Sequence, residues 1–371
     1  MNPQTQFCHN LQCPARGQRG QGNIRVHSQM EQRYCCRTCG QTFAATKGTP
    51  FYRLHTAVDL VTIVLTLLCH GCPIQAIVAA LGLDERTVAA WVARAGRHGQ
   101  QVHEHVVQQG QVDLQHVQAD ELWVKLVGRR VWMAMAMAVP SRLWLGGVLS
   151  RHRDLRLITT LVQRVRSCAH SLALLVCVDG LASYVTVVLR VFRHPVRTGR
   201  RGRPRLVLEQ GLLLGQVVKR YVQRRVVSVE RRVVQGTAEA VAAVLAASGS
   251  TGINTAYIER LNATFRASLA PLVRRGRAIA HTEAALTAGM WLVGCAYNFC
   301  WLHESLRLAA PIGASWKWQE RTPAMAAGLT DRRWTMRELL RYQVPLPPWV
   351  APKRWGRPPT RAQLLAMALV A

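Results

Sequence analysis

Residues 174–180 read LLVCVDG, an apolar run that ends in an aspartate and a glycine. A strand without polar side chains is typical of a sheet that is covered on both faces. In α/β sheets, binding sites lie outside the carboxyl ends of such strands. The segment therefore predicts an α/β fold and puts Asp179 at the edge of the sheet where a site is expected.

A second acidic residue, Asp120, also lies inside an apolar run, which covers residues 117–124 and predicts another strand. The pattern that follows predicts strands over 131–139 and 143–149 and a helix over 154–169. The first of these two strands carries a methionine at every second position, which core packing explains without a cofactor.

The third candidate acid is Glu259, on a helix predicted over residues 255–269. Glu259, Asn262 and Arg266 share one polar face of that helix, because their spacing returns them to the same side. Carboxylates that converge repel one another unless divalent cations lie between them. Two Mg²⁺ or Mn²⁺ ions held by Glu259 and the two aspartates would suit phosphodiester chemistry. For each acid taken alone, the alternative is a solvated or capping carboxylate, and composition by itself does not raise the three above it.

The composition points to a polyanionic partner. The 371 residues include 48 Lys and Arg against 19 Asp and Glu, which gives a net charge of +29. Because 49% of the residues are hydrophobic, the chain can bury a core, and a wholly disordered basic protein is excluded. A single compact domain is not expected at this length. Nucleic acid is the commonest partner of so basic a protein.

Four cysteines near the amino terminus are spaced as metal ligands. Cys8 and Cys13 have four residues between them, and Cys36 and Cys39 have two. Four thiolates on short loops can surround one Zn²⁺ tetrahedrally, and residues 1–55 hold too few aliphatic side chains for a core without metal. We expect a small zinc ribbon here, with the cysteine before Cys36 as a competing ligand. Four ordinary loop cysteines are the alternative.

The remaining cysteine usage favours a reducing cytosol. The chain has 11 cysteines, an odd number, which argues against a disulfide framework. The amino terminus is polar and lacks the pattern of a secretory signal. The most apolar window, residues 131–149, is interrupted by Pro140 and Arg142, whereas a membrane span needs roughly 20 apolar residues. A cytoplasmic protein without a membrane partner is expected.

Residues 56–105 predict the three helices of a helix-turn-helix domain. Apolar residues recur at helical spacing, Pro73 begins the second helix, and Gly82 with Asp84 marks the turn and the cap before the third. The last helix of such a motif can enter the major groove of DNA. The side chains expected to face outward from it are Arg86, Thr87 and Arg94. A plain helical bundle is the alternative.

The order of a cysteine module, a helix-turn-helix and three acids resembles that of the insertion-sequence DDE transposases, whose catalytic domain is RNase H-like. The segments that carry the resemblance are ADELW at 119–123, VDG at 178–180, IERLNATFR at 258–266, LVRR at 272–275, YNF at 297–299 and HESL at 303–306. The catalytic domain would cover residues 113–305. The resemblance implies that Asp120, Asp179 and Glu259 bind the catalytic metal ions. It also implies that the DNA end is held by Asn262, Arg266, Arg274 and Arg275.

The gap between the second and third acids is longer than in compact members of that family. A basic insertion over about residues 191–250 is therefore expected to leave the sheet and return. Residues 191–235 hold 12 basic and 2 acidic side chains, and GRRGRPR at 199–205 resembles the core of an AT-hook, although a solvated loop explains it equally. Residues 216–234 alternate valine with basic residues, which predicts strands with one basic face. The side chains expected to contact DNA here are Arg200, Arg201, Arg203, Arg205, Lys219, Arg220, Arg224 and Arg225.

As a member of that family, the protein would bind terminal repeats in double-stranded DNA and join their 3′ ends to target DNA. Two ends must be joined, so at least a dimer is expected. Residues 306–371 predict an irregular tail rich in Pro, Trp and Arg, with one helix near 336–342. The alternatives are a non-catalytic DNA-binding regulator and an RNase H-like nuclease without strand transfer. The intact set of three acids favours an enzyme.

Overall fold

The computed structural model describes residues 1–197, 199, 202–223, 225–273, 279–310 and 315–351. The described chain divides into two compact units, one comprising Met1–Lys47 with residues 345–351, the other comprising Gly48–Val344. The regions predicted as a helix-turn-helix domain and as an α/β domain therefore share one unit. Residues 306–344 of the predicted tail belong to the same unit.

The first unit is built on a small three-stranded antiparallel sheet. Its elements are the 3-10 helix η1 (Pro3–Thr5) and the strands β1 (Ile24–Ser28), β2 (Arg33–Cys36) and β3 (Thr42–Ala44). The rings of Tyr34 and Phe43 stack with their centroids 5.9 Å apart, and buried cysteines supply much of the remaining core. A core this small is seldom sufficient without a disulfide or a bound metal ion.

The second unit begins with three helices. They are α1 (Val58–Cys69), α2 (Ile74–Leu81) and α3 (Glu85–His103). Gly82 ends α2 with a φ of 62°, a left-handed conformation that glycine adopts without strain. Asp84 accepts a hydrogen bond from the amide of Thr87 and so caps α3. Val88 and Trp91 of α3 are buried in the core that the three helices share.

The long helix α3 joins this bundle to the rest of the unit. It packs against α8 (Glu283–Phe299), and a Cβ atom at Gly96 would come within 2.4 Å of the Ala288 backbone. A Cβ atom at Gly99 would lie 3.2 Å from the carbonyl oxygen of Trp291. These two glycines allow the helix axes to approach closely. This packing accounts for the grouping of residues 56–105 with the sheet in one compact unit.

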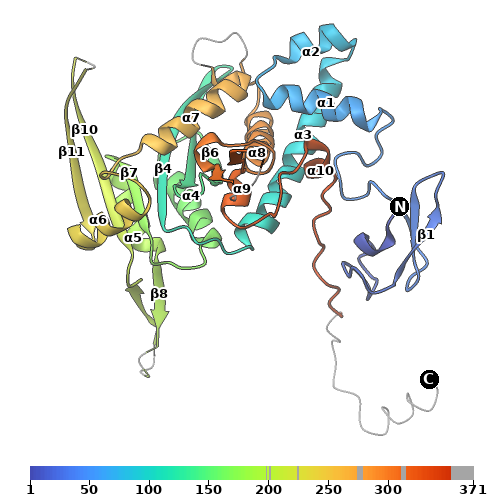
Figure 1. Cartoon of the computed structure of the whole chain (residues 1–371), viewed down its shortest axis with the longest axis horizontal. Helices are drawn as coiled ribbons and strands as arrows, with labels where there is room; N and C mark the ends of the chain where they lie inside the picture. The colour runs from blue at the N-terminus through green and yellow to red at the C-terminus, as the bar shows by residue number, and fades with distance from the viewer. Residues whose placement is uncertain (198, 200–201, 224, 274–278, 311–314, 352–371) are drawn as a thin grey trace. The chain divides into compact units, whose positions relative to one another are not determined.

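A six-stranded mixed sheet forms the centre of the second unit, with the strand order β11-β10-β7-β4-β5-β6 (Figure 1). The strands are β4 (His116–Leu126), β5 (Arg129–Ala138), β6 (Trp144–Ser150), β7 (Leu175–Asp179), β10 (Leu213–Val222) and β11 (Arg225–Gln235). β4, β5 and β6 are antiparallel neighbours, whereas β7 lies parallel to β4 and β10 parallel to β7. The fold class is therefore mixed α/β, as the LLVCVDG segment that forms β7 predicts.

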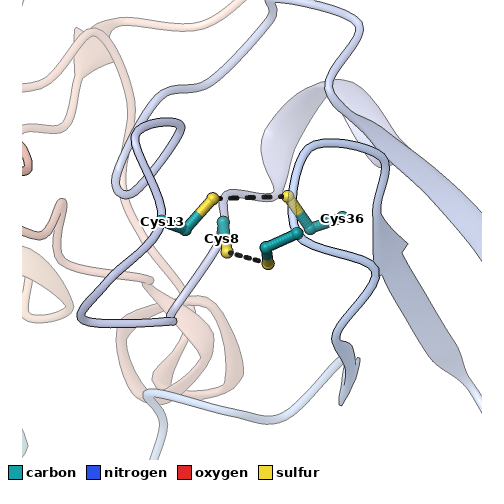
Figure 2. Close-up of side chains that lie close together, drawn as sticks. Cys8, Cys13 and Cys36 are labelled. Atoms are coloured by element: carbon teal, nitrogen blue, oxygen red, sulfur yellow. Dashed lines mark hydrogen bonds between the residues drawn. The ribbon is translucent and has the colours of Figure 1, made fainter.

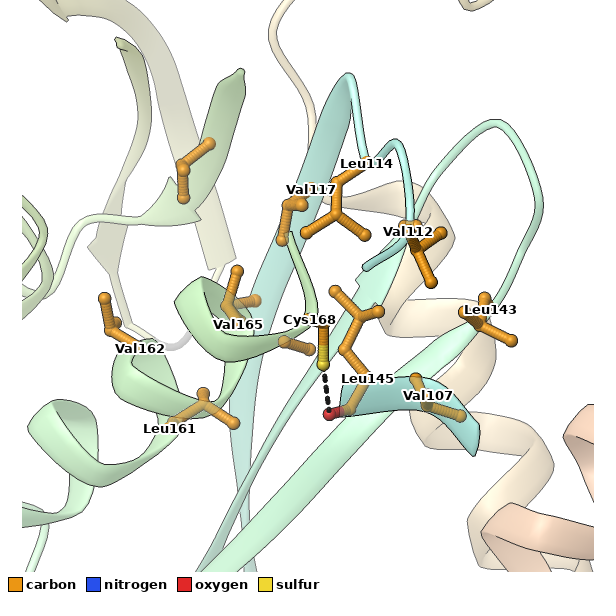
Figure 3. Packing of buried hydrophobic residues seen from close by; sticks show 14 of the residues in the cluster. Val107, Val112, Leu114, Val117, Leu143, Leu145, Leu161, Val162, Val165 and Cys168 are labelled. Carbon is orange, nitrogen blue, oxygen red and sulfur yellow. Dashed lines mark hydrogen bonds between the residues drawn. The ribbon is translucent and has the colours of Figure 1, made fainter. Parts of the chain in front are cut away.

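One face of the sheet packs against α4 (Leu155–Cys168) and α5 (Ala182–Val191). Figure 3 shows valine and leucine side chains of α4 and of the strands meeting in this core, where the Cys168 thiol lies 3.9 Å from the Leu145 carbonyl oxygen. Val117 and Ala119 of β4 are buried on this face. These contacts pack β4 against α4 and α5.

The opposite face packs against α7 (Ala256–Ser268) and α8. Its core contains the three alternate methionines of β5, Met133, Met135 and Met137, all of them buried. The methionine stripe is thus core packing, as the sequence predicts. A smaller core joins α6 (Ala238–Ala247) to the β7 and β10 strands.

The prediction that residues 191–250 leave the sheet is wrong in part. Among the described residues of this segment, β8 (Arg193–Val196) and β9 (Arg205–Leu208) form a hairpin separate from the main sheet. β10 belongs to the main sheet because its residues up to Val217 pair with β7. Beyond Val217, the described residues of β10 and β11 extend from the sheet as a two-stranded pair (Figure 1). Most of their side chains there are exposed. We call residues 218–223 and 225–230 the ribbon.

The ribbon does not have the single basic face that the sequence predicts. Lys219 and Arg220 follow each other on one strand, so their side chains leave from opposite faces. Exposed Tyr221, Val226 and Val229 lie among the basic residues. Both faces of the ribbon therefore combine charged and apolar side chains.

Short elements complete the second unit. They are the π-helical turn η2 (Glu104–Gln108), the 3-10 turns η3 (Ala270–Leu272) and η4 (Glu304–Leu306), the strand pair β12 (Leu308–Ala309) and β13 (Trp318–Gln319), and the helices α9 (Pro323–Ala326) and α10 (Met336–Arg341). The ring of Trp334 stacks on Phe299 of α8 at 4.7 Å. Much of the predicted tail is thus packed structure.

Candidate functional site

Three acidic side chains gather where β4 and β7 lie side by side. Ala119 of β4 pairs with Val178 of β7 in parallel register, which brings the next residues of the two strands, Asp120 and Asp179, close together. Carboxylate oxygens of Asp120, Asp179 and Glu121 lie within 4.8 Å of one another. We call these three residues the carboxylate group. It contains two of the acids selected from the sequence and a third that the sequence analysis did not select.

Glu121 reaches this group from the other face of β4. Successive side chains of a strand alternate, so Asp120 lies on the side of α7 and Glu121 on the side of α5. The Glu121 side chain is fully buried, and the Tyr184 hydroxyl donates a hydrogen bond to it at 2.9 Å. Glu121 is, like Asp120, an acid inside an apolar strand, and this could have marked it as a site residue. The alternation of side chains along a strand, however, predicts that Glu121 and Asp120 point to opposite faces.

Arg153, which lies between β6 and α4, is the counter-ion of two of these acids. Its guanidinium donates hydrogen bonds to Glu121 and to Asp179, the latter at 3.1 Å. Burial, together with the negative charges of Glu121, Asp179 and Glu259, raises the pKa of Asp120 from 3.8 to about 7. One guanidinium therefore does not neutralise the carboxylate group, and a bound cation would be stabilised there.

Asn262 of α7 lies directly against Asp120. Its Nδ2 donates a hydrogen bond to Asp120 Oδ2 at 2.8 Å, while its own Oδ1 is buried without a hydrogen-bond partner among the described residues. A buried oxygen left unsatisfied costs free energy, and beside carboxylates it is a natural ligand for a hard divalent cation. The atoms here that could bind a metal ion are all oxygens, and oxygen ligands suit Mg²⁺ or Mn²⁺ better than softer metals. The residues present thus fit a divalent cation.

Gln118 positions α7 beside the carboxylate group. Its Oε1 accepts hydrogen bonds from the amides of Tyr257 and Ile258, each at 3.0 Å, at the start of the helix. Its Nε2 donates to the Asn254 carbonyl oxygen at 2.8 Å. A β4 side chain therefore satisfies amides that the first turn of a helix leaves without partners. The sequence pattern does not single out Gln118, because its role depends on contacts between segments that lie far apart in the chain.

Glu259 lies near the carboxylate group and is not part of it. Its Oε1 accepts hydrogen bonds from Lys219 of β10 at 2.8 Å and from the Thr255 hydroxyl at 2.9 Å. The Glu259 side chain is 48% exposed. The charge of Glu259 still acts on Asp120, whose pKa it helps to raise. In this structure Glu259 is thus held toward the ribbon.

Four cysteines of the first unit form a second candidate metal centre (Figure 2). The sulfur of Cys8 lies 3.6 Å from that of Cys39, and the sulfur of Cys13 lies 3.9 Å from that of Cys36. Four sulfurs placed about 2.3 Å from a central ion are about 3.8 Å apart at tetrahedral geometry. The arrangement can therefore hold one metal ion.

The structure also separates Cys36 from its neighbour Cys35. The Cys35 thiol donates to the Gly40 carbonyl oxygen at 3.5 Å and does not belong to the four-sulfur cluster. Burial raises the pKa of Cys39, but hydrogen bonds from the Gln41 amide and the Asn10 side chain outweigh it and bring this pKa down to about 7. Cys39 therefore reaches the thiolate form that binds metals near neutral pH.

The residues expected to face outward from α3 differ in their surroundings. Arg86 and Thr87 are exposed. Arg94 is half-buried, and its guanidinium donates to the carbonyl oxygens of Pro50 and Tyr52, the latter at 2.8 Å. Arg94 therefore fixes the chain that leads into the helices.

The other basic residues selected from the sequence are spread over several elements. Arg203, Arg205, Arg220 and Arg225 are exposed. Asn262 is buried against Asp120, and Arg266 is half-buried on α7. The residues that lie outside the described part of the chain are Arg200, Arg201, Arg224, Arg274 and Arg275.

No family model matches the chain, and no curated protein gives a match. Among the helices of the described segments, none combines the length and the apolar character that a membrane crossing requires.

Proposed function

We propose that the protein is a DNA transposase of the DDE type, with an RNase H-like catalytic region. The observation that carries this proposal is the carboxylate group, with Asn262 bound to Asp120 at 2.8 Å. The mixed sheet supports it, because Asp120 lies within the central strand β4 and Asp179 ends its parallel neighbour β7. Sites of α/β proteins occur at such strand ends.

The carboxylate group would hold two Mg²⁺ or Mn²⁺ ions. Bound there, the ions would supply the positive charge that activates an attacking oxygen and stabilises a leaving one in phosphodiester chemistry. Asn262 orients Asp120, and Gln118 holds the helix that carries Asn262. Arg153 keeps Glu121 and Asp179 in place, and its side chain is 35% exposed, so it can also contact a DNA phosphate.

Double-stranded DNA would contact the exposed basic side chains of several elements. The ribbon offers Arg220 and Arg225, and the start of α3 offers Arg86. Arginine and lysine contacts of this kind hold phosphates without reading sequence. The start of α3 would supply base contacts, because the last helix of a helix-turn-helix enters the major groove with its first turns.

The four-sulfur cluster would bind one structural Zn²⁺, because four thiolates at tetrahedral spacing suit that ion. Since transposition joins two DNA ends, the active form would be at least a homodimer. The protein would act where DNA is accessible in the bacterial cytoplasm. These assignments rest on the sequence resemblance together with the donor atoms in the two candidate centres.

A strand-joining assay tests the proposal. The substrates are duplexes from the two DNA flanks of the coding sequence, nicked in advance at their 3′ ends, with a target plasmid and Mg²⁺. Joined product from the native chain, and none from Asp179→Asn, is the expected result. Cleavage without joining would favour a nuclease, and full joining by Asp179→Asn would exclude this carboxylate group as the site.

A non-catalytic DNA-binding protein is the second candidate. It is favoured by one observation, the pairing of Glu259 with Lys219, which keeps this acid out of the carboxylate group. In that case the chain would bind the flanking DNA specifically and give neither cleaved nor joined product with any divalent cation.

A further inference from the structure

A cavity of about 290 Å³ opens on a face of α7 that does not carry Glu259. It lies between α7, the turn that follows β5, the end of α8 and the short turn η4. The polar and aromatic side chains that line it are Arg142, Tyr257, Arg260, Thr264, Tyr297 and His303. None of the lining residues that the structure describes carries a carboxylate.

Two guanidinium groups give this cavity its charge. Arg142 is fixed, because it stacks 3.9 Å above the Tyr257 ring, and its guanidinium also donates to the Val139 carbonyl oxygen in its own turn. Arg260 is exposed and makes no ion pair within the described segments. The cavity thus presents two positive charges without a matching acid, which favours an anion.

The remaining wall of the cavity is neutral. Burial lowers the pKa of His303, and the nearby charges of Arg142 and Arg260 lower it further, so its imidazole is neutral at neutral pH. The Ser305 hydroxyl lies 3.0 Å from His303 Nδ1. Tyr297 is buried and donates its hydroxyl hydrogen to the Arg142 carbonyl oxygen at 3.1 Å. The cavity wall beside the two guanidinium groups therefore consists of uncharged aromatic rings and hydroxyl groups.

We propose that this cavity binds the phosphate of a nucleotide, held by Arg142 and Arg260, with the sugar or base against the tyrosine side of the wall. Guanidinium groups pair with phosphate through parallel hydrogen bonds, and aromatic rings provide contact area for a base. The volume is close to the roughly 300 Å³ at which small-ligand pockets begin, which suits one nucleotide unit. The phosphate can come from a DNA strand or from a free nucleotide. The proposal does not depend on the carboxylate group.

Calorimetric titration without divalent metal tests this site. The probes are thymidine monophosphate, thymidine, and a short single-stranded oligonucleotide without 3′ or 5′ phosphate. Arg260→Gln removes one of the two charges from an exposed position, and Arg156→Gln, at an exposed position of α4, is the matched control. The melting temperature of each variant reports whether the fold is kept.

At least one phosphate-bearing probe is expected to bind the native chain and the Arg156→Gln variant equally. Its affinity should fall at least about tenfold in Arg260→Gln, and thymidine should not bind. A loss seen with the monophosphate identifies a free nucleotide as an occupant, and a loss confined to the oligonucleotide identifies a DNA strand. Equal affinity of native chain and Arg260→Gln for both probes, or binding of neither probe, overturns the proposal. Because no strand cleavage is measured, this result is independent of the proposed transposase activity.

Discussion

Lys219 Nζ lies 2.8 Å from Glu259 Oε1, so an ion pair joins the ribbon to helix α7 beside the carboxylate group. Both side chains are partly exposed, 35% and 48%, and such pairs contribute at most about 1 kcal/mol to stability. DNA phosphates on the ribbon can therefore compete for Lys219. Release of Glu259 would then allow it to join Asp120 and Asp179 when DNA is bound.

Replacement of Lys219 by methionine is expected to strengthen Mn²⁺ binding in the absence of DNA by about threefold to tenfold, because Glu259 loses its cationic partner. Electron paramagnetic resonance of free Mn²⁺ measures the affinity. Arg225→Met removes a charge from the same ribbon without touching Glu259 and should leave the affinity unchanged. An unaltered affinity in Lys219→Met would show that the ion pair does not restrain Glu259.

Among the uncharged residues near the carboxylate group, Gln118 is expected to be the one whose replacement lowers stability and strand joining most. Gln118→Leu leaves the amides of Tyr257 and Ile258 without their acceptor, which costs about 1–3 kcal/mol for each buried group. Urea unfolding should show this loss, and strand joining should fall with it. Gln101→Leu, at an exposed position of α3, is the control for the change in side-chain type. Equal stability of the two variants would contradict the helix-positioning role.

The four-sulfur cluster predicts a contrast between neighbouring cysteines. Cys36→Ser should abolish the binding of one Zn²⁺ per chain and unfold the first unit, because zinc binding to such sites is worth about 10–16 kcal/mol. Cys35→Ser should keep the metal. Atomic absorption and amide exchange of the first unit measure both effects. Retention of zinc by Cys36→Ser, or its loss from Cys35→Ser, would reverse the assignment.

Acid should destabilise the second unit through His103. This side chain is completely buried, and burial lowers its pKa to about 3, whereas the unfolded value is 6.5. The stabilising contribution is therefore present above pH 6.5 and lost as the pH falls, by about 3 kcal/mol between pH 6.5 and 4. His103→Gln should flatten this part of the stability curve, and His152→Gln, at an exposed position, should not. Parallel curves for all three proteins would contradict the effect.

The central acids could be predicted from the sequence, because Asp120 and Asp179 stand out as charges inside apolar strands. Parallel pairing of β4 with β7 then makes them neighbours. Glu121 could not be selected in this way, since strand alternation predicts that it diverges from Asp120. Its place in the group depends on Arg153 and on Tyr184, both from other elements.

The pattern of residues 216–234 predicted strands correctly but not the sheet that they join. Alternation reports which side chains are exposed and carries no information on the partner strand, here β7. The packing of α3 against α8 could not be predicted for a similar reason. In the sequence, Gly96 indicates only a residue that destabilises a helix, and its role becomes clear from the close approach of the Ala288 backbone.

Anomalous diffraction from a crystal soaked in Mn²⁺ shows whether Asp120 and Asp179 bind a divalent cation together. A manganese peak is expected within about 2.5 Å of carboxylate oxygens of Asp120 and Asp179, and no such peak is expected in the Asp179→Asn variant. Ordered manganese elsewhere on the chain, with none at these two aspartates, would contradict this expectation.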